Sequence, residues 1–211
     1  KYGVPEDKIF FSPHAVDQDF WKVVSDERAR GFKFIWVAKF IDKKRPEDVI
    51  LAFKKLLKDH PEYIKKIELN MVGTGVLLEQ CKKLGTGIEE LRFSGFKNQK
   101  ELRDEYARSN CLLLSSDYRE TWGLVVNEAF SCGLPAIVSD ACGCAANLIE
   151  GKCGLVYKMG NVDQLSSAMY RILKEQSDQE ILRERALSIT EKNRVFSFQR
   201  NRKAFQAFLE V

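Results

Sequence analysis

Residues 111–139 of this 211-residue chain read CLLLSSDYRETWGLVVNEAFSCGLPAIVS, and the order of patterns in this segment indicates the fold class. Residues 111–114 form a short apolar run without polar alternation, which is typical of a strand buried on both faces. We expect a helix over 123–131, ended by a left-handed residue at Cys132-Gly133, and a second buried strand over 135–139. A buried strand, a helix and another buried strand predict two parallel strands joined by a crossover helix.

The same alternation of buried strands and amphipathic helices runs through the rest of the chain. Strands are expected at 33–37, 67–72, 91–94 and 155–157, and helices at 46–57, 77–84 and 101–108. Beyond Asn161 the pattern is helical only, and the last helix is expected at 198–210. With right-handed crossovers, these elements predict a doubly wound, Rossmann-like α/β domain with a parallel sheet and C-terminal helices.

Ligands of such sheets bind in the crevice beyond the carboxyl ends of the strands. At that edge, Glu120 precedes the helix over 123–131 and Glu128 lies inside it, so the two acids flank the helix start. The first N–H groups of a helix have no acceptor within it, so those of Gly123 to Val125 would offer an anion site between the two acids. Hydroxyl acceptors on both sides of a phosphate site are what a nucleotide-linked sugar requires. This is our first functional hypothesis.

The composition disfavours several classes of protein. A hydrophobic content of 45% with mixed charges is typical of a globular domain, and no apolar run approaches the roughly 18 residues of a membrane span. The formal net charge of +4 comes with no basic stripe or aromatic-rich basic strand, which disfavours nucleic-acid binding. The six cysteines lack the paired spacing of a zinc site, so we expect buried free thiols in a reducing cytosol.

Four motifs carry a resemblance to a known family. Residues 120–129 (ETWGLVVNEA) match the pattern E-x-x-G-x-x-x-x-E-A, and residues 133–140 (GLPAIVSD) match G-x-P-V-I-x-T-D. Residues 36–39 (WVAK), followed by Lys44, are similar to V-G-R…K, and residues 12–17 (SPHAVD) are similar to P-N-G-V-D. In this order and spacing the motifs resemble the C-terminal, donor-binding half of a retaining glycosyltransferase of family 4 (glycosyl transferases group 1), which has the two-domain GT-B fold.

The resemblance implies a role for each matched position. Glu128 would accept hydrogen bonds from the ribose of the nucleotide, and Glu120 would hold hydroxyl groups of the sugar. Lys39 and Lys44 would neutralise the diphosphate as charge grows on the leaving group. The other expected donor-binding positions lie after the second strand, at the edge of the base and at the helix start: Gly73; Gly95, Phe96 and Lys97; and Trp122, Gly123, Leu124 and Val125.

The resemblance also implies a division into domains. Residues 1–190 would be the donor-binding domain, and residues 191–211 a helix that crosses to an N-terminal, acceptor-binding domain absent from the chain. Phe205 and Phe208 on that helix would then be exposed, the alternative being that they dock locally. Because the chain begins at Lys1 and lacks the acceptor domain, we expect a partial enzyme that binds its donor weakly and is inactive alone.

The implied reaction needs no metal and no cofactor, and its donor substrate would be a UDP- or GDP-sugar. The acceptor would be a glycan or a lipid-linked glycan, as in polysaccharide biosynthesis. We expect a cytoplasmic enzyme without a membrane span, and the alternative for the full-length protein is peripheral association with the inner face of the cytoplasmic membrane.

Three positions depart from the family pattern. Lys39 stands where arginine is usual, which keeps the charge but loses the bidentate geometry. Cys142-Gly143 stands where two glycines are common, and Ala146 where a glutamate is common. These changes leave the contribution of the loop over 140–146 to sugar binding open.

Other functions stay open or fail on the sequence itself. Gly73-Thr74-Gly75 invites a dinucleotide-dependent oxidoreductase, but Leu78 stands where the third glycine belongs, and no acid follows at Ser94-Gly95. Asp17-Gln18-Asp19 imitates a D-x-D metal site but precedes the first core strand, so we expect no metal there. A non-catalytic nucleotide-binding or scaffold domain remains the alternative to a transferase.

Overall fold

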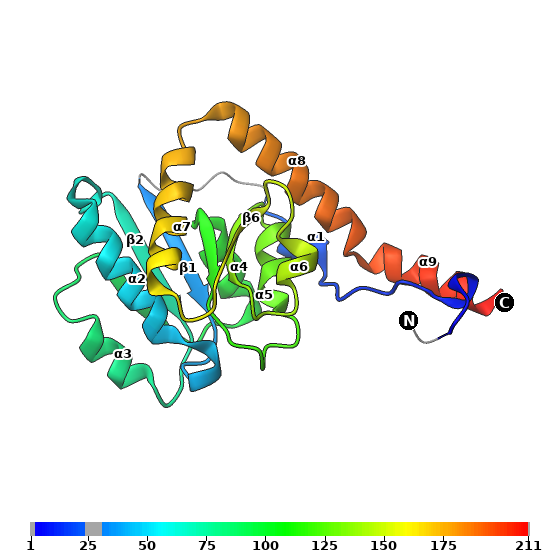
Figure 1. Ribbon diagram of the computed structural model, residues 1–211, viewed down its shortest axis with the longest axis horizontal. Helices are drawn as coiled ribbons and strands as arrows, with labels where there is room; N and C mark the ends of the chain where they lie inside the picture. Colours follow the sequence, from blue (N-terminus) through cyan, green and yellow to red (C-terminus); the bar gives the residue numbers. More distant parts are fainter. Residues whose placement is uncertain (1–2, 24–30, 211) are drawn as a thin grey trace.

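In the computed structural model, which describes residues 3–23 and 31–210, six strands form one parallel sheet in the order β3-β2-β1-β4-β5-β6 (Figure 1). The order reverses between β1 and β4, where Phe34 pairs with Cys111, and this is the switch point of a doubly wound sheet. The predicted fold class is therefore confirmed. The strands are β1 (Phe32–Val37), β2 (Ile67–Val72), β3 (Leu91–Gly95), β4 (Cys111–Leu114), β5 (Ala136–Ser139) and β6 (Gly154–Tyr157).

The predicted strands agree with the observed strands to within one residue at each end. β4 and β5 are buried at every position, as their unbroken apolar runs predict. Pro135 lies outside β5 because proline has no N–H for the ladder, although its carbonyl accepts from the N–H of Leu112 at 2.9 Å. β6 begins at Gly154, where a Cβ would lie 1.9 Å from the carbonyl oxygen of Ala136 on β5.

Helices cover both faces of the sheet (Figure 1). Phe34 and Trp36 of β1 point into one core cluster and Ile35 into the other, which is the two-residue period of a strand. The first cluster lies under α2 (Pro46–Asp59), α3 (Leu78–Leu84) and α7 (Val162–Glu175). The second lies under α1 (Gln18–Trp21), α4 (Gln99–Ala107), α5 (Leu124–Ser131) and α8 (Gln179–Val195). Shorter elements are the 3-10 helices η1 (Glu6–Lys8) and η3 (Pro61–Tyr63), and α6 (Ala145–Leu148).

Three helices begin away from their predicted starts. α3 begins at Leu78, one residue late, and the starts of α4 and α5 have local reasons. α4 begins at Gln99, two residues early, because Asn98 and Glu101 form a capping box in which each side chain bonds the other's backbone N–H. α5 begins at Leu124 because Gly123, with φ of 107°, has a left-handed backbone and serves as the N-cap. The sequence pattern does not delimit α8, since most of its side chains are exposed.

The last helix, α9 (Phe198–Leu209), projects from the body of the domain beside the N-terminal segment (Figure 1). The rings of Phe10 and Phe208 are in contact, with centroids 5.8 Å apart. Phe205 and Phe208 are still 67% and 59% exposed, so the local contact with Phe10 covers only part of the Phe208 ring. None of the helices in the described part of the chain has the length and apolar composition that a membrane crossing requires.

All six cysteines are buried, as predicted. Burial raises the pKa of Cys81 to about 11 and those of Cys111 and Cys142 to about 12. These thiols therefore remain protonated at neutral pH and behave as small apolar side chains.

Candidate functional site

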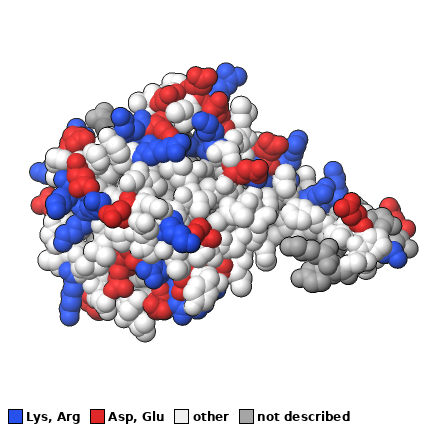
Figure 2. Space-filling view, viewed as in Figure 1, with Lys and Arg blue, Asp and Glu red and all other residues white. Residues whose placement is uncertain are grey.

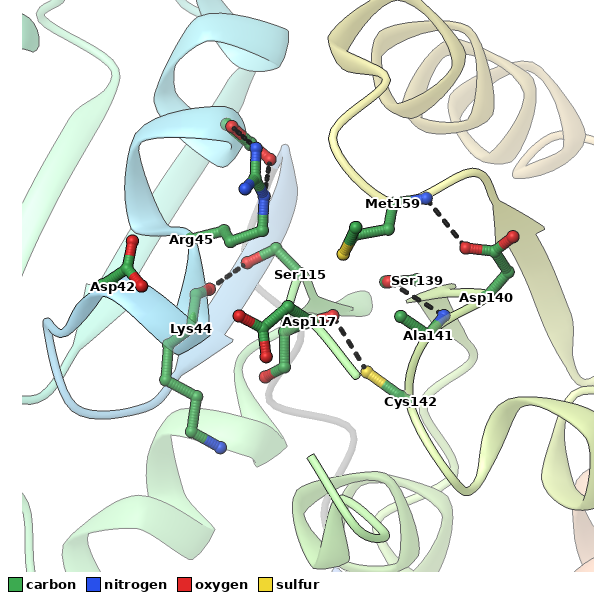
Figure 3. Close-up of polar contacts among 12 residues, drawn as sticks. Asp42, Lys44, Arg45, Ser115, Asp117, Ser139, Asp140, Ala141, Cys142 and Met159 are labelled. Carbon is green, nitrogen blue, oxygen red and sulfur yellow. Dashed lines mark hydrogen bonds and ion pairs between the residues drawn. The ribbon is translucent and has the colours of Figure 1, made fainter. Parts of the chain in front are cut away.

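Three loops meet beyond the carboxyl ends of β1, β4 and β5, at the edge where the sequence predicts a site (Figure 3). The loop after β1 contains the 3-10 helix η2 (Asp42–Lys44), and the carbonyl of Lys43 accepts from the N–H of Asp117 in the loop after β4 at 2.9 Å. The thiol of Cys142, in the loop after β5, donates to the carbonyl of Ser116 at 3.5 Å. The three loops are therefore in direct contact.

Lys44 and Glu120, which are 76 positions apart, form an ion pair between two of these loops. The Lys44 side chain is 18% exposed and that of Glu120 is 12% exposed, and Glu120 also accepts a hydrogen bond from the Ser116 hydroxyl at 3.1 Å. Partial burial makes such a pair stronger than one at the open surface. The structure thus brings together two of the three predicted catalytic residues.

Lys39, the third, also lies at the carboxyl end of β1, but its side chain is exposed. It forms no ion pair with any residue in 3–23 or 31–210, and its carbonyl accepts from the N–H of Ile41 at 2.9 Å. Its ammonium group is therefore available to a ligand. The diphosphate role of Lys39 stays a prediction.

Helix α5 begins beside the Lys44–Glu120 pair with unpaired N–H groups. Those of Gly123, Leu124 and Val125 have no acceptor among the described residues. A Cβ on Gly123 would lie 2.7 Å from Cδ2 of Leu114, so only glycine fits this N-cap against β4 without a shift. Because the helix dipole adds partial positive charge at these groups, the start of α5 is suited to bind an anion.

The indole N–H of Trp122 is hydrogen-bonded within the protein. Its indole N–H donates to Oδ1 of Asn127 at 2.8 Å, and its ring lies 4.8 Å from that of His14 and 5.7 Å from that of Phe196. The side chain therefore fixes the loop before α5 against the N-terminal segment. A direct contact of Trp122 with a ligand stays a prediction.

Glu128 lies in the second turn of α5 and is half-buried. Its Oε2 accepts a hydrogen bond from the hydroxyl of Tyr106, a fully buried residue of α4, at 3.0 Å. Burial raises the pKa of Glu128, and the hydrogen bond from Tyr106 partly opposes this rise. The carboxylate is thus held by the protein and does not point into bulk solvent. The sequence does not reveal Tyr106, because an aromatic residue on the buried face of a helix has the pattern of ordinary core.

Replacing Glu128 with glutamine is expected to raise the melting temperature at neutral pH. Because burial raises the folded-state pKa, the stability that this group contributes is full below its unfolded pKa and is lost as pH rises through its folded pKa. Glutamine has no ionised form, so its burial carries no cost of desolvating a charge, and its side-chain oxygen can still accept a hydrogen bond from Tyr106. Calorimetric melting from about pH 4 to about pH 8 checks this, since the two proteins should converge at the acid end. Equal melting temperatures at every pH would contradict it.

Gly143 lies where the loops after β4 and β5 touch. Its N–H donates to the carbonyl of Glu120 at 3.1 Å, and a Cβ at this position would lie 1.9 Å from the carbonyl oxygen of Thr121. Glycine is therefore required at position 143, the second glycine of the family pattern, because any side chain would clash with the backbone of Thr121.

We expect Gly143→Ala to reduce the free energy of unfolding by roughly 2–3 kcal/mol, because the added methyl group must displace the loop that carries Glu120. Urea denaturation measures the change. Gly87→Ala is a reference for backbone strain without a clash, since Gly87 has a φ of 85° but a Cβ there meets nothing within 4 Å. A loss at Gly143 no larger than the strain-related loss at Gly87 would contradict the expected clash with Thr121.

The glycines after β2 allow a close approach of backbones. A Cβ on Gly73 would lie 1.9 Å from the carbonyl oxygen of Ala38, and one on Gly75 would lie 2.4 Å from that of Phe40. Both glycines also have positive φ. Contact with the loop after β1 thus accounts for the G-x-G pattern, and a ligand contact of Gly73 stays a prediction.

Gly95, Phe96 and Lys97 lie at the end of β3. β3 is three strands away from β4, which is about 14 Å at the usual strand spacing. Phe96 is 75% exposed, and the carbonyl of Gly95 accepts from the N–H of Gly73 at 2.8 Å. The structure shows no contact between these residues and the Lys44–Glu120 pair, so their role at the base stays a prediction.

Asp17 of the D-x-D sequence caps a helix, since its carboxylate accepts from the N–H of Phe20 at 3.1 Å. Within the residues that the structure describes, no group of three or more histidine, cysteine, aspartate or glutamate side chains is placed to hold a metal ion. The first D-x-D carboxylate therefore has a structural role in α1.

Comparison with known proteins identifies relatives among sugar transferases. The poly(glycerol-phosphate) alpha-glucosyltransferase of Bacillus subtilis (strain 168) is 25% identical over 191 residues, which are 89% of this chain and 27% of that protein. The sulfoquinovosyl transferase SQD2 of Arabidopsis thaliana is 32% identical over 142 residues, which are 65% of this chain and 27% of that protein. The chain therefore spans little more than a quarter of the length of either relative.

Solved structures show the same fold. A glycosyltransferase from Rickettsia africae ESF-5 superposes with a TM-score of 0.81 at 15% identity, covering 100% of this chain and 59% of that chain. The sucrose-phosphate synthase of Thermosynechococcus elongatus gives a TM-score of 0.76 at 22% identity, covering 94% of this chain and 51% of that chain. The parallel sheet with its flanking helices is thus the Rossmann-like fold found in GT-B glycosyltransferases.

The family comparison covers most of the chain and all of the loops described above. Residues 17–188 match the family described as Glycosyl transferases group 1, a span that includes Lys44, Glu120 and Glu128. The chain belongs to the glycosyl transferases group 1 family.

Proposed function

We propose that the chain is the donor-binding domain of a retaining glycosyltransferase of family 4, which transfers a sugar from a nucleotide diphosphate sugar to a glycan or lipid-linked acceptor. One observation carries the proposal. The Lys44–Glu120 pair adjoins the unpaired N–H groups that open α5, and Glu128 lies on the same helix. A cation, an anion site and two hydroxyl acceptors are the groups that such a donor needs.

The diphosphate is bound at the start of α5. Lys44 turns from Glu120 to the phosphate oxygens, and the N–H groups of Gly123 to Val125 bind the same oxygens. Negative charge on the diphosphate increases as its bond to the sugar breaks, so these groups stabilise the transition state more than the ground state. Lys39 adds a second cation, and no metal ion takes part in the proposed step.

The two acids bind the two ends of the donor. Glu128 accepts hydrogen bonds from the ribose hydroxyls, with its orientation set by Tyr106. Glu120, released from Lys44, accepts hydroxyl groups of the transferred sugar next to the reacting carbon. The loop of Gly95 to Lys97 borders the base, which we propose to be that of a UDP- or GDP-sugar. Trp122 and Gly73 form the remaining sides of the donor-binding site.

We propose that residues 1–190 bind the donor and that residues 191–211 form the segment that crosses to an acceptor-binding domain. The boundary lies inside α8, and the helices break at Phe196 and Ser197, so the crossing begins with α9. The exposed phenyl rings of α9 support a partner surface outside this chain. The relative from Bacillus subtilis is named an alpha-glucosyltransferase, which supports retention for a donor with an alpha linkage. The whole enzyme works in the cytoplasm or at the inner face of its membrane.

Calorimetric titration of the 211-residue chain with UDP, GDP and ADP tests the proposal, with inorganic pyrophosphate as a probe of the phosphate site alone. We expect weak binding of one nucleoside diphosphate and no sugar transfer by the chain alone. Absence of heat with every nucleotide at millimolar concentration would refute the proposal and favour the scaffold alternative. Measurable transfer would refute the need for a second domain.

A further inference from the structure

We propose that Ser115 is a positioning residue for Lys44, because its buried hydroxyl joins the indole of Trp36 to the carbonyl of Lys44. This inference rests on the proposed function. Lys44 lies in η2, on a different loop from Glu120 and the start of α5. Its ammonium group can therefore reach a diphosphate at the start of α5 only if η2 is held in a fixed position relative to the sheet. Neither the family match nor the sequence motifs assign Ser115 a role.

The bridge consists of two hydrogen bonds between buried groups. The indole N–H of Trp36 donates to Oγ of Ser115 at 2.9 Å. The Ser115 hydroxyl donates in turn to the carbonyl of Lys44 at 2.7 Å (Figure 3). Trp36 is fully buried in β1, and Ser115 is 1% exposed at the end of β4. A rigid side chain of the sheet therefore sets the position of a backbone carbonyl at the end of η2.

A second set of contacts holds the same turn from its other end. The side chain of Arg119 bonds both Asp117, on its own loop, and Asp42, in η2, with nitrogen–oxygen distances of 2.5 Å to each. Hydrogen bonds from Arg119 hold the pKa of the Asp117 carboxyl below its usual range, so this carboxylate is charged at neutral pH. The Asp42 side chain is 85% exposed, so this second contact is the weaker of the two.

The position of Ser115 predicts which ligands its loss affects. The proposed ribose acceptor, Glu128, is held by Tyr106 and has no bond to Ser115 or to η2. A displaced η2 therefore moves Lys44 away from the phosphate oxygens and leaves the ribose contact in place. A general loss of folding would lower the affinity for every ligand by the same factor. Comparing ligands with and without the diphosphate therefore distinguishes a positioning effect from a loss of stability.

The experiment compares Ser115→Ala with wild type and Lys82→Ala. Lys82 forms a surface ion pair within α3, away from the site, and its loss should leave all affinities unchanged. NMR titration measures the affinity for the nucleoside, for the nucleoside diphosphate and for the nucleotide sugar. We expect Ser115→Ala to lose about tenfold in affinity for the two diphosphates and to keep the nucleoside affinity. Asp42→Ala removes an exposed carboxylate and should not disturb folding. We expect it to lose about threefold in affinity for the two diphosphates and to keep the nucleoside affinity.

Two results would overturn the inference while leaving the proposed function intact. One is wild-type diphosphate affinity in folded Ser115→Ala, and the other is an equal loss for nucleoside and diphosphate in that variant. If Ser115→Ala fails to fold, the diphosphate selectivity of Asp42→Ala decides. Wild-type protein that binds no nucleotide would instead refute the proposed function, and the inference with it.

Discussion

Replacing Lys44 with methionine is expected to lower kcat of the full-length enzyme by roughly 10²–10³-fold, the usual effect of losing one preorganised group at a developing charge. Methionine keeps most of the length of the side chain and removes only the ammonium group. Because Lys44 is partly buried beside the start of α5, its charge acts where water screens it poorly. KM for the donor should change less than kcat, since charge on the leaving group is greatest in the transition state.

Steady-state kinetics with the matched variant Lys43→Met measure this effect. Lys43 is the neighbouring cation in η2, and its side chain forms no ion pair in the described part of the chain. A loss of kcat with Lys43→Met as large as that with Lys44→Met would show that general positive charge, and not the placement of Lys44 opposite Glu120, supports the reaction.

The second large effect is expected for Glu128→Ala, which should weaken nucleotide binding by about 100-fold or more. A carboxylate that accepts two ribose hydroxyls contributes two hydrogen bonds to a charged group, each worth about 1.5–3 kcal/mol. The variant also leaves the buried hydroxyl of Tyr106 without its acceptor. The loss should be the same for nucleoside and diphosphate, in contrast to the selective loss expected for Ser115→Ala.

Calorimetry on Glu128→Ala and on the control Glu62→Ala tests this prediction. Glu62 is an exposed residue of η3, which precedes β2 and therefore lies at the edge of the parallel sheet opposite the candidate site. Its replacement should leave nucleotide affinity unchanged. If Glu128→Ala binds the nucleoside as tightly as the wild type does, Glu128 does not bind the ribose.

The sequence predicts the sheet well because its strands are buried on both faces. Unbroken apolar runs such as those of β4 and β5 leave little choice of structure, and both match within one residue. Helix ends depend on local caps. The capping box of Asn98 and Glu101 is present in the sequence but lies ahead of the apolar pattern, which explains the early start of α4. For the polar, mostly exposed helix α8, the apolar pattern supplies no boundary.

The candidate site is only partly predictable from the sequence. The motifs indicate Lys44, Glu120 and Glu128, because charged residues at strand ends and helix starts meet at one edge of a parallel sheet. Tyr106 and Ser115 escape prediction, since their bonds to Glu128 and Lys44 join side chains and backbone far apart in the chain. The distribution of charge on the surface adds little, as basic and acidic side chains alternate across the face shown in Figure 2.

The most direct test of the account is an amide-resolved NMR titration of the chain with a nucleoside diphosphate and with the same nucleoside. We expect the diphosphate to shift the N–H signals of Gly123, Leu124 and Val125 most strongly, and the nucleoside alone to leave them nearly unchanged. Shifts confined to other loops, with these three signals unmoved at saturating diphosphate, would contradict the claim that a phosphate binds at the start of α5.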